Sequence, residues 1–420
     1  MQPSTARRAP QPAGLRSLPR NVWVVTIASF LTDISSEMVL NLLPLFLASV
    51  LGVKTGVIGL IEGIAETTSS LLKVFSGWFS DRLGRRKWLT VTGYGLSAVA
   101  KPFLYFAASW WGVLAVRFAD RVGKGVRTAP RDALVAASVD EHHRGIAFGL
   151  HRAGDTAGAA LGLLIALVVV LASQAGQVAL SRETFQAVVL ISIVPAVLAV
   201  VVLAVGVREV GAASRPAAPP RLTLGGFDGR FRRFLLAAVV FTLGNSADAF
   251  LILRASTLGA SVAAVLGVLF TLNVVYALVS GPAGALSDRI GRRRLIVGGW
   301  LFYSVIYLGF AVASEAWQAW ALYALYGVYY GMAEGTARAL VADLVRAERH
   351  GTAYGVYNTA VGLMALPASL IAGILWQGVA GWEGLGPAAP FVFGALMALL
   401  AVVILSRALA QAPGPSGAGH

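Results

Sequence analysis

Acidic residues recur at helical spacing inside stretches of the chain that are otherwise apolar. Asp33 and Glu37 are four residues apart, and so are Glu62 and Glu66. Four residues make about one helical turn, so each pair lies on one face of a helix. Carboxylates in a low-dielectric cavity can load and release a proton near neutral pH. We therefore expect proton coupling at a set of buried acids, which are Asp33, Glu37, Glu62, Glu66, Asp155 and Asp248.

Basic residues form a second pattern, concentrated between residues 110 and 136. A stripe of about 140° on one helix holds Arg117, Asp120, Arg121, Lys124, Arg127, Arg131 and Asp132. These cations either neutralise nearby carboxylates, which adds little net stability, or bind a polar solute. Both roles stay open for Asp120, Arg127, Arg131 and Asp132. The residues better placed for an anionic or polar solute are Arg117, Arg121, Lys124 and Arg152.

The second half of the chain offers fewer charges and more amide and hydroxyl groups. Its candidates for lining a solute cavity are Asn245, Asn273, Tyr276, Tyr330, Glu334 and Arg338. The tyrosines between residues 323 and 330 fit stacking on a solute or filling a helix interface, and we favour filling for any single tyrosine. Glu334 and Arg338 are four residues apart and can also pair with each other.

The composition indicates which elements must position these residues. The chain has 420 residues, of which 57% are hydrophobic and 13% charged, whereas soluble domains carry about 25% charged residues. This excludes an ordinary soluble enzyme and a disordered scaffold. The formal charge of +14 fits loops facing anionic lipid better than nucleic-acid binding. There is no cysteine, and the five histidines lack metal-ligand spacing, so we expect no cofactor and no metal site.

Twelve stretches are long and apolar enough for a membrane-spanning helix, which needs about 20 residues. They are centred on 21–50, 56–80, 88–108, 110–136, 145–172, 185–207, 233–257, 262–286, 295–313, 316–342, 352–378 and 389–410. The predicted fold is an all-α membrane protein with twelve transmembrane helices in two pseudo-symmetric six-helix bundles. We expect it to act as a monomer among membrane lipids.

A polar linker divides the predicted bundles. The expected organisation is an N-terminal tail (1–20), a bundle (21–207), a linker (208–231), a second bundle (232–411) and a C-terminal tail (412–420). The external segments hold Lys54, Arg182 and Arg254, and the other loops hold far more basic residues. This asymmetry places both termini on the cytoplasmic face of the cell membrane. The first tail lacks an apolar core, so it is not expected to be a signal peptide.

The two halves of the chain resemble each other. Residues 77–86 read G-W-F-S-D-R-L-G-R-R, and residues 284–293 read G-A-L-S-D-R-I-G-R-R. An A-L-V-A run at 133–136 recurs at 339–342 with nearly the same offset. Duplicated membrane halves are typical of transporters, which bind their solute between the halves. A weak alignment of the repeats also places Asp248 opposite Glu37.

The repeated G-x-x-x-D-R-x-G-R-R pattern resembles motif A of the major facilitator superfamily, and the resemblance covers nearly the whole chain. It implies a gate motif in each half, made of Gly77, Asp81, Arg82, Gly84, Arg85, Arg86, Gly284, Asp288, Arg289, Gly291, Arg292 and Arg293. By resemblance, Asp81, Arg82 and Arg85 form a latch that closes the inner gate. Asp288 and Arg292 are expected to do the same in the second half.

Two further patterns are similar to motifs of this family. The run from Arg117 to Gly123 resembles motif B, but Asp120 and Arg121 replace the usual Gln and Gly, so only the role of Arg117 carries over. A glycine-spaced run resembles motif C, which is associated with antiporters, although it lacks the usual proline. Its glycines equally suit close helix packing, and they are Gly154, Gly158 and Gly162.

The predicted function is secondary active transport of a small polar solute, with an anionic group favoured by the basic stripe. Alternating access with proton-coupled antiport, and thus export, is preferred, and proton-coupled symport for uptake is the alternative. The expected partners are the solute, protons and lipids. A polytopic membrane enzyme acting on lipids is a remote alternative, because the sequence has no H-E-x-x-H, G-x-S-x-G or Walker A motif.

Overall fold

The computed structural model describes residues 18–140, 143–210, 224–346 and 349–410, and within these ranges it forms helices and no strand. An isolated bridge pairs Val379 with Trp382. In chain order the helices are α1 (Arg20–Leu40), α2 (Leu43–Leu45), the π-helix η2 (Phe46–Val50), α3 (Thr55–Leu83), α4 (Lys87–Ala100), the 3-10 helix η3 (Lys101–Phe106), α5 (Trp110–Ala137), α6 (Arg144–Gln174), α7 (Arg182–Gly206), α8 (Gly229–Gly244), α9 (Ala249–Thr257), α10 (Val262–Ile290), α11 (Arg292–Val312), α12 (Ala316–Asp343), α13 (His350–Gln377) and α14 (Ala389–Ala410).

These helices occupy the twelve stretches expected from the sequence. Eight helical segments of the described chain are long and apolar enough to cross a membrane. Large apolar side chains also point outward, and that of Val312 is 81% exposed, as a lipid-facing surface requires. The all-α membrane class is therefore confirmed. The stretches that form α3, α4 with η3, α5 and α12 fall outside the eight, so the count of twelve spans stays a prediction.

The predicted tails and linker lie mostly outside the described residues. These begin at residue 18, omit residues 211–223 and end at residue 410. The second half begins with α8 at Gly229, three residues before the predicted start of the second bundle at residue 232.

Two predicted spans, 21–50 and 233–257, are interrupted in the structure. The first span breaks after Leu40, where the Asn41 amide donates to the backbone oxygen of Glu37 (2.9 Å) and to its carboxylate (2.8 Å). The second breaks between Gly244 and Ala249. Glycine and asparagine are weak helix formers, and both breaks bring polar groups to the interior.

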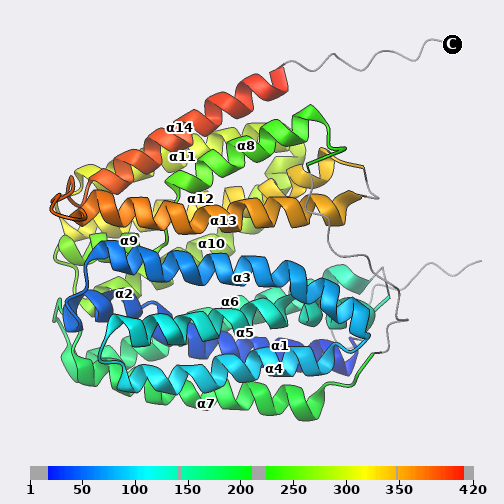
Figure 1. Ribbon diagram of the computed structural model, residues 1–420, viewed down its shortest axis with the longest axis horizontal. Coiled ribbons are helices and arrows are strands. Elements are labelled where there is room, and N and C mark those ends of the chain that lie inside the picture. Colours follow the sequence, from blue (N-terminus) through cyan, green and yellow to red (C-terminus); the bar gives the residue numbers. More distant parts are fainter. Residues whose placement is uncertain (1–17, 141–142, 211–223, 347–348, 411–420) are drawn as a thin grey trace, which may run out of the picture.

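The helices run between two distinct ends of the molecule (Figure 1). One end of the molecule is here called the capped end. There the hydroxyl of Ser181 accepts a hydrogen bond from the backbone N–H of Thr184 (3.2 Å), and the hydroxyl of Ser261 accepts one from the backbone N–H of Ala264 (3.1 Å). Such caps satisfy N–H groups that the first helical turn leaves unpaired. At the other end, the motif end, α3 stops at Gly84, whose φ of 63° suits a residue without Cβ.

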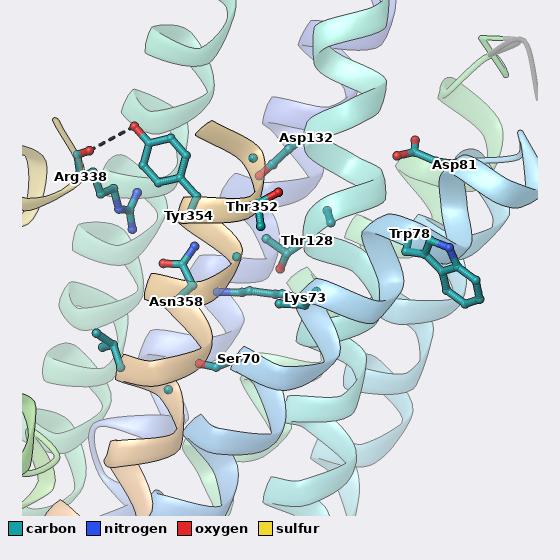
Figure 2. Close-up of a pocket in the computed structure, with 16 residues that line it drawn as sticks. Ser70, Lys73, Trp78, Asp81, Thr128, Asp132, Arg338, Thr352, Tyr354 and Asn358 are labelled. Carbon is teal, nitrogen blue, oxygen red and sulfur yellow. Dashed lines mark hydrogen bonds between the residues drawn. The ribbon is translucent and has the colours of Figure 1, made fainter. Parts of the chain in front are cut away.

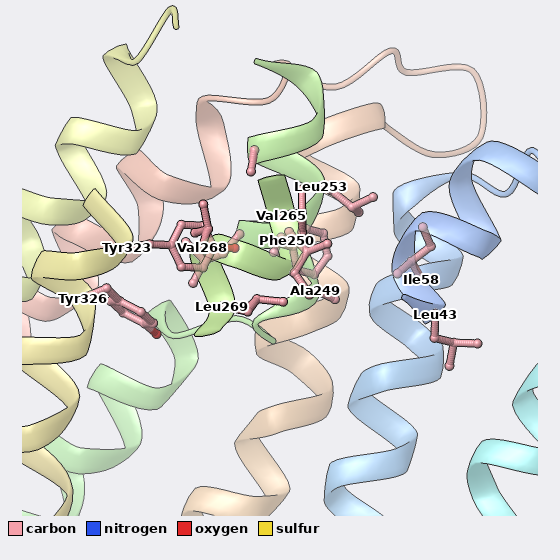
Figure 3. Packing of buried hydrophobic residues seen from close by; sticks show 14 of the residues in the cluster. Leu43, Ile58, Ala249, Phe250, Leu253, Val265, Val268, Leu269, Tyr323 and Tyr326 are labelled. Carbon is pink, nitrogen blue, oxygen red and sulfur yellow. The ribbon is translucent and has the colours of Figure 1, made fainter. Parts of the chain in front are cut away.

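The helices of the first half lie below those of the second half in Figure 1, and α3 and α13 face each other across the boundary. Glycines let these two helices cross closely: a Cβ added at Gly63 would lie 2.7 Å from the Cα of Leu366. The Thr67 hydroxyl also donates to the backbone oxygen of Gly362 (2.8 Å). Toward the capped end, apolar side chains of both halves, including Ile58 and Phe250, belong to one buried cluster (Figure 3).

Candidate functional site

Three adjoining cavities lie between the halves. We call them the central cavity (490 Å³), the side cavity (770 Å³) and the motif-end cavity (890 Å³; Figure 2). Glu37 lines both the central and the side cavity, and Ser70 lines both the central and the motif-end cavity. Lys73 and Asp132 line both the side and the motif-end cavity. The three cavities therefore share walls from the middle of the molecule to the motif end.

Two ion pairs join α3 to α5 at the wall of the central cavity. Arg117 pairs with Glu62, and both side chains are buried. The Arg121 guanidinium lies 3.0 Å from the Glu66 carboxylate, which is 44% exposed. The sequence suggested that both arginines face the solute, and both line the central cavity. Each arginine also has a carboxylate partner on α3, and these two partners lie one helical turn apart.

The buried pair is expected to carry stability. Replacing Glu62 with glutamine leaves the Arg117 charge buried, where its Nε and Nη1 have no hydrogen-bond partner among the described residues. Breaking such a pair costs about 3–5 kcal/mol, so thermal unfolding in detergent should move to clearly lower temperature. Glu66→Gln should move it much less, because water reaches that carboxylate.

A double variant separates charge from packing. Glu62→Gln with Arg117→Met removes both charges and should recover much of the lost stability, since apolar replacements of buried pairs are often neutral. Equal unfolding temperatures for Glu62→Gln and Glu66→Gln would contradict the assignment of Glu62 to a structural pair.

The break between α8 and α9 forms the second-half wall of the central cavity. The Asn245 side-chain oxygen accepts hydrogen bonds from the hydroxyls of Tyr303 (3.3 Å), Tyr307 (3.4 Å) and Tyr326 (3.4 Å). These bonds hold the break in place. Asp248 is the last residue of this break and lines the cavity that Glu37 also lines. The two acids that the repeat aligns therefore border the same cavity.

The tyrosines of α12 divide between packing and cavity. Tyr323, Tyr326 and Tyr329 are buried among other aromatic rings, so they fill a helix interface. Tyr330 lines the central cavity and contacts the ring of Tyr276 edge-on, with centroids 6.3 Å apart. Tyr330 is thus the tyrosine of this group that is placed to meet a solute.

The side cavity is rich in charge. Its basic lining residues are Lys73, Lys124, Arg127, Arg131, Arg152 and Arg338. Its acidic lining residues are Asp33, Glu37, Asp132 and Asp155. Arg131 pairs with Asp132 at 2.8 Å, and Arg152 donates to the Tyr276 hydroxyl of the other half at 2.7 Å. Six basic groups against four acids leave this cavity formally positive.

Three second-half candidates border the side cavity, and one cannot be placed. Asn273, Tyr276 and Arg338 line it, and the Asn273 amide donates to the backbone oxygen of Leu269 (3.0 Å). The side chain of Glu334 lies outside the described part of the structure, so its expected pairing with Arg338 stays a prediction.

Sequence reasoning missed Lys101 and His151. Lys101 is 2% exposed, and its Nζ donates to the hydroxyls of Ser35 (2.7 Å) and Ser36 (3.0 Å), between Asp33 and Glu37 on α1. Lys101 could have been found from the sequence, because it is an ionisable residue inside the predicted span 88–108. His151 is buried and lines the side cavity. It was missed because the histidines were considered only as metal ligands, and a single histidine has no ligand spacing.

The two gate motifs make matching contacts at the motif end. Arg86 donates to the backbone oxygen of Ala133 (3.3 Å), and Arg292 donates to that of Ala339 (2.8 Å). These alanines begin the repeated A-L-V-A runs. The arginines differ in place, because Arg86 is the last residue of its motif and Arg292 is the last but one. Arg86 also pairs with Asp81 at 3.2 Å. Arg86 and Arg292 are therefore each bound within their own half.

The other motif residues lie around these contacts. The Arg82 guanidinium stands 5.6 Å from the ring centre of Trp78, and Arg293 donates to the backbone oxygen of Ser406 (2.7 Å). Gly291, like Gly84, has a positive φ, of 92°. The remaining members are exposed or half-buried, and they are Gly77, Arg85, Gly284, Asp288 and Arg289.

The glycines of the antiporter-like run face α1. A Cβ added at Gly154 would lie 2.7 Å from Cγ2 of Thr26, and one at Gly162 would lie 2.6 Å from the backbone oxygen of Ile34. Gly158 meets the backbone oxygen of Phe30. Close packing of α6 on α1 therefore requires small residues here.

Comparison with known proteins gives consistent matches. The family model described as Major Facilitator Superfamily matches residues 25–253 and 233–419. An uncharacterized MFS-type transporter of Methanocaldococcus jannaschii is 35% identical over 396 residues, covering 93% of this chain and 95% of that protein. The multidrug resistance protein MdtG of Enterobacter lignolyticus is 26% identical over 328 residues, covering 71% and 72%.

Solved structures share the fold at low sequence identity. A POT family transporter in complex with 5-aminolevulinic acid has a TM-score of 0.77 at 13% identity, covering 94% of this chain and 97% of that one. The nucleoside transporter NupG has a TM-score of 0.72 at 12% identity, covering 92% and 98%.

Proposed function

The chain belongs to the major facilitator superfamily, and from this premise we propose that it exports a small polar solute bearing an anionic group in exchange for protons. The matched proteins are membrane transporters and not enzymes. The hypothesis of a membrane enzyme acting on lipids is therefore set aside. The observation that carries the proposal is the positively charged side cavity between the two halves.

The proposed architecture is two six-helix bundles, residues 21–207 and 232–411, joined by a cytoplasmic linker in the cell membrane. Twelve helical stretches support it, and so does the bond from a motif arginine to the first alanine of the A-L-V-A run in each half. The excess of basic residues at the motif end supports cytoplasmic termini. We expect the monomer to be the working unit, with lipid around it.

Transport follows from rocking of the two bundles. The α3–α13 crossing and the apolar cluster close the capped end in the structure, while the cavities reach the motif end. In the opposite state the bundles separate at the capped end, and the latch of Asp81 and its motif closes the motif end. The solute is then exposed first to one side of the membrane and then to the other.

The anionic group of the solute is assigned to Lys124 and Arg152. Arg117 and Arg121 have carboxylate partners on α3, so they remain in the wall of the central cavity as neutralised groups. Lys124 and Arg152 line the side cavity, and closure around a solute removes the water that solvates them. A negative group on the solute replaces that water.

Proton coupling is assigned to acids that line the cavities. Glu66 and Asp248 border the central cavity, Asp33 and Asp155 border the side cavity, and Glu37 borders both. Antiport is preferred because the MdtG relatives are named multidrug resistance proteins and the run around Gly158 resembles an antiporter motif. Symport would use the same acids, but the solute would then move in the same direction as the protons.

A ligand screen tests the assignment of charge. Compounds matched in size, with one anionic and one cationic member per pair, are scored by thermal stabilisation of the purified protein. A ligand at about 100 times its Kd adds roughly 2.7 kcal/mol, and anions are expected to dominate. Lys124→Gln and Arg152→Gln should each abolish the shift, whereas Arg407→Gln on the exposed end of α14 should keep it.

The opposite outcome is equally clear. Cations that stabilise the wild type and both cavity variants equally, with no anion active, would return Lys124 and Arg152 to a structural role.

A further inference from the structure

The side cavity contains buried polar atoms that lack partners. His151 is 4% exposed, and neither of its ring nitrogens has a hydrogen-bond partner among the described residues. One carboxylate oxygen of Asp155, Oδ1, is also buried without a partner, while Oδ2 lies 3.9 Å from Nε2 of His151. Buried polar groups are normally paired, and leaving one unpaired costs about 1–3 kcal/mol. Both residues line the side cavity, so a solute held there is a candidate partner for these atoms.

The surroundings of this pair combine donors with an acceptor. Lys124 of α5 and Arg152 of α6 line the same cavity and supply positive charge. The other charged side chains that line it are Asp33, Glu37, Lys73, Arg127, Arg338 and the paired Arg131 and Asp132. The unpartnered oxygen of Asp155 accepts hydrogen bonds and cannot donate one while it is ionised. The cavity is thus a basic site with an acidic oxygen in it.

An anion with acceptor oxygens alone fits such a site poorly. A sulfate or simple carboxylate oxygen beside Asp155 would meet a second acceptor and a like charge. An oxyanion that keeps a proton donates that O–H to Asp155, while its other oxygens accept from Lys124 and Arg152. A neutral histidine has one donor and one acceptor nitrogen, so His151 can bond either kind of oxygen.

We propose that the His151–Asp155 pair makes the side cavity selective for a protonated oxyanion, of which a phosphate or phosphate monoester group is the chemical class. This inference rests on the proposed function, since it specifies the anionic group that the solute carries. Sites built around a hydrogen bond reject analogues that lack it strongly, because their own polar groups are left unpaired. Phosphate retains a proton at neutral pH, and sulfate does not.

Equilibrium dialysis of the purified full-length protein with radiolabelled inorganic phosphate at pH 7 tests the proposal. Unlabelled phosphate and sulfate compete at matched ionic strength. We expect saturable binding against which sulfate competes at least about tenfold more weakly than phosphate. Asp155→Asn should bring the two competitors within about threefold of each other, because an amide N–H can donate to sulfate.

Two controls keep the readings separate. Asp132→Asn removes an acid that lines the same cavity and pairs with Arg131, and it should leave the preference for phosphate intact. Lys124→Gln should weaken the binding of both phosphate and sulfate, because it removes a positive charge and leaves the acceptor oxygen of Asp155 in place.

Each result has one meaning. Equal competition by sulfate and phosphate in the wild type would overturn the selectivity and leave the anion site standing. A preference for phosphate that survives Asp155→Asn would overturn the role of Asp155. The absence of saturable binding of phosphate, with anions of the ligand screen still active at Lys124 and Arg152, would overturn this inference alone. The absence of any anion binding would overturn the proposed anion site as well.

Discussion

Replacing Glu66 with glutamine is expected to abolish solute accumulation driven by a pH gradient, while folded protein remains in the membrane. The Glu66 carboxylate is half-exposed to the central cavity and lies 3.0 Å from Arg121. A proton that binds there releases Arg121, whereas a glutamine amide binds no proton and cannot switch between the paired and the released state. Asp33→Asn in the side cavity should have the same effect. The measurement is uptake into proteoliposomes with an imposed pH gradient, for a solute found in the ligand screen.

Glu183→Gln is the matched control. Glu183 is an exposed acid in the first turn of α7, so its amide should transport at the wild-type rate. If Glu66→Gln and Asp33→Asn also accumulate solute at that rate, the coupling assignment is wrong.

Replacing Asp81 with asparagine is expected to slow transport by about tenfold or more, whereas Asp288→Asn should have a small effect. Loss of a charge-assisted bond of the latch costs about 1.5–3 kcal/mol, and tenfold corresponds to about 1.4 kcal/mol. Asp81 borders the motif-end cavity and its carboxylate is the partner of Arg86. The readout is the initial rate of solute transport in proteoliposomes.

The expected asymmetry has a structural reason that differs from the one the sequence suggested. The sequence suggested fewer partner charges in the second half. In the structure Arg292 has two acids, Asp343 at 2.5 Å and Asp288 at 3.7 Å. Asp343 still holds Arg292 when Asp288 is lost, so the double variant Asp288→Asn with Asp343→Asn should slow transport as Asp81→Asn does. Equal effects of the two single variants would contradict this explanation.

The sequence predicted the helices well and their interruptions poorly. The length of an apolar stretch and its helical period are set by residues close together in the sequence, so they can be predicted from it. All twelve stretches coincide with helical segments. The break at Asn245 depends on Tyr303, Tyr307 and Tyr326, which come from two later helices. No local pattern contains that information.

The site was predicted as a set of residues and not as a set of partners. Helical spacing grouped Asp33 with Glu37, and both residues line the side cavity. It could not show that Arg121 is joined to Glu66, because the register of α3 against α5 is a tertiary property. His151 was missed because its significance comes from burial and from unpaired nitrogens, and neither is visible in a sequence.

The coupled exchange of solute and protons is tested most directly by the pH of a sealed lumen. Wild-type protein is reconstituted with a pH-sensitive dye inside the vesicles and equal pH on both sides, and the solute is then added outside. Antiport predicts that the lumen becomes more alkaline, whichever way the protein is inserted, because each solute that enters sends protons out. Vesicles containing Glu66→Gln should show no change. A lumen that becomes more acidic on solute entry would establish symport and contradict the account, and solute entry without a pH change would contradict proton coupling altogether.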